Sequence, residues 1–249
     1  MWRRRRRARR VVVALDALDG AERSIAALDA RASVEVGDAV RAGTRCGNMY
    51  GMPPLVPIAL EGTHVRLEPL LHDHARGLHA ATEDDELWSW LSYDLRDPAM
   101  LERWMKEAFD ARDRGTEMPF AVILRTSGDV IGSTRYLDIR STFKGLEIGW
   151  TWYRRDTWGG PVNPECKYLL LRHAFEVWGA IRVCLKTDIK NLHSQNAIKK
   201  LGAKYEGTLR NHYIRRDGTY RDSVYFSIID TEWPAVKRGL EERLAEVGR

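Results

Sequence analysis

The stretch WTWYRRDTWGGPVNPECKYLLLRHAF, residues 150–175, decides how this chain is interpreted. It starts with a pattern typical of a strand, passes through a short loop that contains Gly159 and Gly160, and continues directly into an apolar helical pattern. Backbone N–H groups converge in such a loop, and the helix start adds unpaired N–H groups and its positive dipole end. The stretch therefore predicts an anion site suited to a pyrophosphate, with Arg154 and Arg155 able to pair with phosphates. A plain connection is the alternative, because the loop has neither the GxxxxGK nor the GxGxxG pattern.

Strand and helix patterns surround this stretch, with turn residues between them. Strand patterns predict strands at residues 63–70, 119–126, 130–139, 146–153, 181–187, 205–210 and 220–229. Helical spacing of apolar residues predicts helices at residues 72–82, 97–114, 163–178, 191–201 and from 232 onward, and Asp97 can cap the second of them. The sequence Arg216-Asp217-Gly218 between the last two strands predicts a hairpin-type turn. Only turns separate the second, third and fourth strands, so we expect an antiparallel meander there. The whole order predicts a mixed α/β fold, with a mostly antiparallel central sheet flanked by helices.

The N-terminal segment differs in composition from the rest of the 249-residue chain. Residues 1–52 contain eleven arginines, no lysine and six acidic residues, so the net charge of +5 belongs to this segment. The remainder balances to zero, and bulk charge gives no reason to expect a nucleic-acid partner for it. We interpret residues 1–57 as an extension, either a disordered tail or translated sequence upstream of a start at Met49 or Met52. Residues 58–249 form the predicted domain.

The sequence indicates no membrane-spanning segment, no disulfide framework and no metal site. No apolar run approaches the roughly 18 residues that a membrane span needs, so we expect a soluble, cytoplasmic protein. Cys46, Cys166 and Cys184 show no paired spacing, and the histidines between residues 64 and 79 lack a HExxH pattern or a partner cysteine. We therefore expect reduced thiols and no metal site.

Motifs after the loop make the signal more specific. They are the N-L-H-S sequence with Asn191 and Ser194, then Lys200-Leu201-Gly202-Ala203, Glu206-Gly207, Asp217-Gly218, Arg221-Asp222 and Glu232-Trp233. As an ordered set between about residues 60 and 233, these motifs resemble the GNAT acetyltransferases, most closely their RimJ/RimL-type branch. Members of that branch modify amines such as protein N-termini and small molecules. The resemblance implies acetyl-CoA as acyl donor and a GNAT-like sheet whose strands splay apart at the coenzyme A site.

In that family the loop before the long helix binds the pyrophosphate of coenzyme A through backbone N–H groups. The resemblance assigns cofactor binding to Trp152, Arg154, Trp158, Gly159, Gly160, Val162 and Asn163. Pro161 departs from the family pattern, which has a glycine there, and proline has no N–H to donate. The side chain of Asn163 compensates for this donor in one interpretation and caps the helix in the other, and the two roles are compatible.

Two residues near the next helix match family positions. Asn191 matches an asparagine that contacts the pantetheine arm, and Ser194 matches a serine near the thioester. The alternative for Ser194 is a helix cap. Many relatives outside the branch carry a tyrosine four residues after this serine, as the acid for the departing thiolate. Ile198 stands there in this chain, so the resemblance leaves Ser194 or water as the acid.

Glu147 is the candidate general base. Amines are largely protonated at neutral pH, so a base is useful, and Glu147 lies on the strand that leads into the loop, where family members often hold a carboxylate. Apolar neighbours would raise its pKa, and the alternative is a solvent-facing carboxylate. We expect a backbone N–H within residues 150–152 to polarise the thioester oxygen. Aromatic candidates for either acceptor-pocket walls or the core are Trp88, Trp90, Tyr93, Tyr136 and Trp152.

These residues predict an N-acetyltransferase that moves the acetyl group of acetyl-CoA to a primary amine by direct attack in a ternary complex. The acceptor is a protein N-terminus or a small-molecule amine, and the sequence does not choose between them. Three alternatives stay open: a transferase for another acyl-CoA, a CoA-binding regulatory module without catalysis, or nucleic-acid binding through the Arg-rich N-terminal segment. We expect acetyl-CoA and an amine as partners, no membrane or nucleic acid, and a monomer or homodimer.

Overall fold

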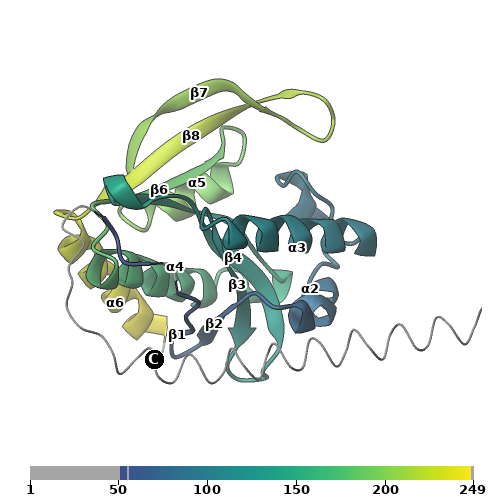
Figure 1. The fold of residues 1–249 in the computed structure, drawn as a ribbon, viewed down its shortest axis with the longest axis horizontal. Coiled ribbons are helices and arrows are strands. Elements are labelled where there is room, and N and C mark those ends of the chain that lie inside the picture. The colour runs from purple at the N-terminus through teal and green to yellow at the C-terminus, as the bar shows by residue number, and fades with distance from the viewer. Residues whose placement is uncertain (1–50, 55, 248–249) are drawn as a thin grey trace, which may run out of the picture. The chain divides into compact units, whose positions relative to one another are not determined.

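A computed structural model of the chain describes residues 51–54 and 56–247. The predicted extension therefore lies outside the described residues except for its last positions, and Cys46 lies outside them as well. The strands are β1 (Leu60–Glu61), β2 (Val65–Pro69), β3 (Met118–Leu124), β4 (Val130–Arg140), β5 (Gly145–Tyr153), β6 (Arg182–Asp188), β7 (Lys204–Ile214) and β8 (Tyr220–Ile229) (Figure 1). The helices are α2 (Ala75–Ala80), α3 (Pro98–Asp113), α4 (Val162–Arg172), α5 (Leu192–Lys199) and α6 (Trp233–Val247).

The strands of the described residues form one sheet in the order β1-β2-β3-β4-β5-β6-β8-β7. Its neighbours are antiparallel except β5 and β6, which run parallel and are connected through α4. The predicted meander is confirmed, because β3, β4 and β5 pair antiparallel in chain order. The predicted hairpin at Asp217-Gly218 is confirmed as well, since the Arg215 N–H donates to the Thr219 carbonyl at 2.8 Å across it. The mixed α/β class with a mostly antiparallel sheet is thus correct.

The sheet buries a separate apolar core on each face because strand side chains alternate. On β3, Phe120 and Val122 point into the larger core, and Ala121 and Ile123 point into the smaller one. Helices α4, α5 and α6 cover the larger core, and we call this side of the sheet the α4 face. Helices α2 and α3 cover the smaller core on the other side, which we call the α3 face.

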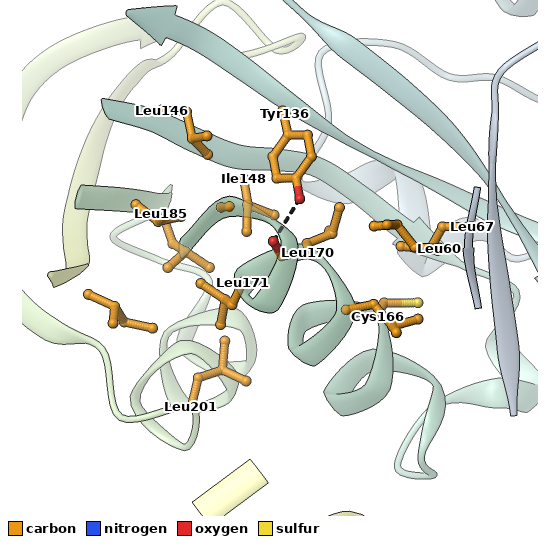
Figure 2. Close-up of a cluster of buried hydrophobic side chains, with 14 of the residues drawn as sticks. Leu60, Leu67, Tyr136, Leu146, Ile148, Cys166, Leu170, Leu171, Leu185 and Leu201 are labelled. Carbon is orange, nitrogen blue, oxygen red and sulfur yellow. Dashed lines mark hydrogen bonds between the residues drawn. The ribbon is translucent and has the colours of Figure 1, made fainter. Parts of the chain in front are cut away.

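Tyr136 on β4 shows how the α4 face is fixed. Its side chain is fully buried, and its hydroxyl donates to the Leu170 carbonyl of α4 at 2.6 Å (Figure 2). Leu146 and Ile148 of β5 pack into the same cluster. Tyr136 therefore belongs to the core, and its suggested place in an acceptor pocket is wrong.

Local signals set the helix starts with small deviations from the predicted positions. Asp97 caps α3 as expected, and its carboxylate accepts from the Ala99 N–H at 2.9 Å. Helix α4 begins at Val162, one residue earlier than expected, and continues into a π-turn at His173–Val177. The segment predicted as one helix at residues 72–82 is a 3-10 turn followed by α2.

The carboxylate of Glu165 ties the start of α4 to the β1–β2 turn. It accepts hydrogen bonds from the three amides of residues 63–65 at 2.7, 2.7 and 2.8 Å. Gly62 leaves room for this group, because a Cβ at that position would lie 2.6 Å from the Glu165 carboxyl carbon. Within residues 51–54 and 56–247, no helix has both the length and the apolarity needed to cross a membrane.

Candidate active site

A cavity of about 600 Å³ lies where β5 and β6 meet α4 and α5. Most residues that the sequence assigns to the site line it: Glu147, Trp152, Trp158, Gly159, Gly160, Asn163, Asn191 and Ser194. Its charged side chains are Glu147, Lys167, Lys186, Lys200, Arg221 and Arg243. One carboxylate thus faces five cationic groups, and this balance favours an anionic ligand.

The cavity exists because β5 and β6 separate. Their parallel pairing covers three residue pairs and ends at Glu147 opposite Cys184. From Ile148 onward, no residue of β5 in the described structure pairs with β6. Main-chain groups on that edge of β5 are therefore open to a ligand, as the resemblance implies for the pantetheine arm.

A β-bulge at Trp150 reverses the orientation of the side chains that follow it. Trp150 has a positive φ of 49°, and three residues of β5 span the register that two residues of β4 cover between Ser133 and Arg135. The added residue turns Trp152 into the core of the α3 face and Thr151 toward α4. No sequence pattern had indicated this bulge.

Residues 158–163, which we call the amide loop, present unpaired N–H groups to the cavity. Gly159 has a φ of +77°, and nothing lies within 4 Å of the position that its Cβ would occupy. Within the described chain, the N–H groups of Gly159, Gly160, Val162 and Asn163 have no hydrogen-bond partner. Pro161 has no N–H, so every amide hydrogen from residue 159 to residue 163 is available to an anion.

Asn163 does not cap α4, so that interpretation is wrong. The N-cap position belongs to Pro161, and Asn163 lies inside the first turn of the helix. Its Oδ1 accepts a hydrogen bond from the Tyr153 hydroxyl at 3.3 Å. Asn163 also lines the cavity.

Arg154 and Val162 are the predicted residues that do not line the cavity. The guanidinium of Arg154 bonds to Asp156 at 2.8 Å and forms an ion pair with Asp129 at 3.4 Å. Val162 is buried in the larger core, so its backbone N–H is the group that it offers at the loop. Arg155 lies over the ring of Trp158 at 4.3 Å.

Glu147 is buried, with 4% of its surface exposed, so the solvent-facing interpretation is wrong. Its neighbours Leu146 and Ile148 face α4, which places the carboxylate on the α3 face. Burial raises the pKa of Glu147, and the Lys186 ammonium, 2.9 Å from Oε2, opposes this. Burial alone would lower the pKa of Lys186, but the carboxylate outweighs it and the pKa of Lys186 is raised.

Asn191 caps α5, and Ser194 does not. The Asn191 Oδ1 accepts from the Ser194 N–H at 2.9 Å, which makes the cap interpretation of Ser194 wrong. Among the described residues, the Ser194 hydroxyl has no hydrogen-bond partner. Both side chains line the cavity beside Ile198.

Sequence reasoning missed the cationic residues of the cavity. Lys167 lies four residues after Asn163, and this helical spacing places both on one side of α4. Lys186 is two positions after Cys184, the register partner of Glu147, so strand alternation brings it to the carboxylate. Lys200 and Arg243 carry no such signal, because α5 and α6 meet only through the fold.

The aromatic candidates divide between the cavity and the core. Trp90 and Trp152 line the cavity, whereas Trp88 is buried on the α3 face, 5.3 Å from the Trp152 ring. Trp88 is therefore a core residue. The indole N–H of Trp152 has no partner among the described residues. In that part of the chain, no group of three histidine, cysteine or carboxylate side chains is placed to hold a metal ion.

Comparisons with known proteins agree with this geometry. A family described as the acetyltransferase (GNAT) domain matches residues 64–204. A GCN5-related N-acetyltransferase from Brucella melitensis is similar in structure, with a TM-score of 0.73 and 29% identity over 79% of this chain and 90% of that one. A candidate acetyltransferase from T. thermophilus shares 36% identity, with a TM-score of 0.68 over 76% of this chain and 98% of that one.

More distant comparisons bear on the fold alone. RimJ from Mycobacterium smegmatis, solved in complex with CoA-disulfide, is 21% identical with a TM-score of 0.63, over 79% of this chain and 96% of that one. Comparison with curated protein sequences gives no match.

Proposed function

This chain belongs to the GNAT acetyltransferase family, and we propose that its amide loop holds the pyrophosphate of acetyl-CoA while Glu147 takes a proton from the attacking amine. The chain is an N-acetyltransferase that transfers the acetyl group of acetyl-CoA to a primary amine. The observation that carries the proposal is the set of four amides of the amide loop that have no partner among the described residues. Main-chain donors at a helix start suit a diphosphate without needing a paired cation.

Other residues of the cavity support this placement of acetyl-CoA. Lys200 and Arg243, which line the same cavity as the amide loop, supply positive charge for the remaining phosphate of coenzyme A. The open edge of β5 after Glu147 accommodates the pantetheine arm, and Asn191 faces it from α5. RimJ of M. smegmatis binds CoA-disulfide on the same fold, and with the N-L-H-S sequence this supports placement in the RimJ/RimL-type branch.

Glu147 suits the role of base by position and by pKa. It lies at the last register pair before β5 and β6 separate, so its carboxylate borders the gap from the α3 face. Its raised pKa makes it a stronger proton acceptor than an exposed glutamate. A main-chain N–H within residues 150–152, at the bulge, is our proposed donor to the thioester oxygen.

Thiol release from acetyl-CoA with a panel of amines tests the proposal. The panel contains peptide N-termini, amino acids, polyamines and aminoglycosides, and succinyl-CoA replaces acetyl-CoA in a second series. We expect Glu147→Gln to lower turnover by about 100-fold or more while the calorimetric Kd for acetyl-CoA stays unchanged. Glu102→Gln, on the exposed side of α3, is the matched control.

Ile198, in the place of the tyrosine, favours one second candidate, a CoA-binding module without catalysis. Heat of binding without thiol release from any amine would support that candidate. An absence of binding heat would remove the amide loop from the account.

We further propose an acetyltransferase domain that spans residues 58–249, acts in the cytoplasm and is a monomer or homodimer. β1 begins at Leu60 and the family match begins at residue 64, both within this range. Met52 lies before it but is buried in the larger core and donates its N–H to the Ser141 carbonyl at 3.1 Å, so the residues just before 58 contact the domain as well. Light scattering on the purified protein measures the oligomeric state.

A further inference from the structure

Lys167 is a buried ammonium in the cavity that the mechanism above does not use. Only 6% of its surface is exposed, and it faces the cavity from the second turn of α4. Its Nζ donates to the Thr151 hydroxyl at 2.6 Å, and the Thr151 hydroxyl lies 2.8 Å from that of Thr134. Among the described residues, no carboxylate forms an ion pair with it.

A buried lysine without a counter-charge is uncommon, because burial penalises the charged form. The titratable group that acts on Lys167 is its neighbour Cys166, which is neutral because burial raises its pKa to about 12. Tyr153 on β5 also lines the cavity and is neutral, because burial raises its pKa well above its usual value. Burial lowers the pKa of Lys167 to about 8. Of the other charged groups around the cavity, Glu147 is paired with Lys186, and Arg243 on α6 adds only positive charge.

The bulge in β5 decides what Lys167 faces. In a regular strand the Thr151 side chain would point away from α4, as that of Glu147 does, but the added residue at Trp150 turns it toward α4. Lys167 therefore lies against the segment that we propose to polarise the thioester oxygen. Glu147 borders the same gap from the opposite face of the sheet.

We propose that Lys167 is the acid of the acetyl transfer and donates a proton to the sulfur of coenzyme A as the thioester breaks. This inference rests on the proposed function. The C–N bond forms as the amine loses a proton to Glu147, and the C–S bond breaks as the sulfur takes a proton from Lys167. Glu147 is then protonated and Lys167 is neutral, and one proton that passes through water from the first to the second restores both.

Two physical features support this assignment. A free thiol has a pKa of about 8.5, and a proton moves most readily between groups of similar pKa, which the pKa of Lys167 at about 8 provides. Lys167 also supplies the protonation step that Ile198 cannot perform, and in this proposal it takes the place of Ser194 or water, the acids that the resemblance left open.

The competing role for Lys167 is to bind the phosphates of coenzyme A, and the position of its ammonium argues against that role. The amide loop ends at Asn163 in the first turn of α4, and Lys167 comes four residues later, roughly 6 Å along the helix axis. Its ammonium is turned toward β5 rather than toward the loop.

Titration of the coenzyme A thiol in the binary complex tests the inference without any acceptor. The ultraviolet absorbance of the thiolate is followed against pH for the wild type, for Lys167→Met and for Lys199→Met, an exposed lysine of α5 outside the cavity. We expect the bound thiol to titrate about one pH unit or more lower in the wild type than in Lys167→Met. Lys199→Met should match the wild type. Equal thiol pKa values in all three proteins would overturn the inference even if acetyl transfer is intact.

Steady-state kinetics gives the second readout. Lys167→Met should lower kcat by about 100-fold, leave the Kd of acetyl-CoA nearly unchanged, and remove the fall in kcat at alkaline pH. Lys167→Arg keeps the charge but does not titrate, so it too should lose the alkaline fall. A weaker Kd with unchanged kcat would identify a phosphate anchor instead and overturn the proposal. If the wild type binds acetyl-CoA but acetylates no amine, the proposed function fails, and the thiol titration still decides the role of Lys167.

Discussion

Replacement of Glu165 by alanine should destabilise the domain strongly, although this residue touches no substrate. Only 4% of its surface is exposed, and its carboxylate accepts three backbone N–H groups from the β1–β2 turn. Alanine leaves those donors without an acceptor. The start of α4, and with it the amide loop, would lose its link to the edge of the sheet.

The magnitude follows from the three bonds. The Val65 N–H is buried, so its loss leaves an orphan donor worth about 1–3 kcal/mol, whereas the other two are partly exposed and lose roughly 1 kcal/mol each because water replaces part of the bond. The total is about 3–5 kcal/mol, a large share of the roughly 5–15 kcal/mol that stabilises a typical domain. For a domain of this size, we expect the Tm to fall by about 10 °C.

Thermal and urea unfolding, followed by circular dichroism, measure this change. Glu102→Ala, at an exposed site on α3, should shift the free energy of unfolding by no more than about 0.5 kcal/mol. A loss below about 1 kcal/mol in Glu165→Ala would refute the reasoning, since it would mean that water satisfies all three amides.

Two further predictions concern the cavity. In Lys186→Met the pKa of Glu147 should rise further, because the ammonium that opposes the effect of burial is gone. A base must be ionised to act, so the acid limb of the pH profile of kcat/KM should move to higher pH. An unmoved acid limb would show that Glu147 does not act as the base. Pro161→Ala adds an N–H to the amide loop and should tighten acetyl-CoA binding by roughly 1 kcal/mol, about fivefold in the calorimetric Kd. Weaker binding would show that the rigid backbone of the proline contributes more to the shape of the loop than the added donor contributes to binding.

The sequence predicted the parts of the site that depend on neighbouring residues. The amide loop, the capping of α3 by Asp97 and the hairpin at Asp217-Gly218 each need only a few consecutive residues, whose backbone preferences act locally. Glu147 was proposed from its place on the strand that leads into the loop, together with the carboxylate that members of the family often hold there.

Tertiary structure alone decided which side chains meet across the cavity. The bulge at Trp150 depends on the register between β4 and β5, and it determines that Thr151 turns toward Lys167. The placement of β8 between β6 and β7 likewise depends on how whole strands pair. Spacing along a chain fixes which face of its own element a residue occupies, but the partner opposite that face is chosen by the packing of distant segments, whose contacts are stabilised only when the entire core forms.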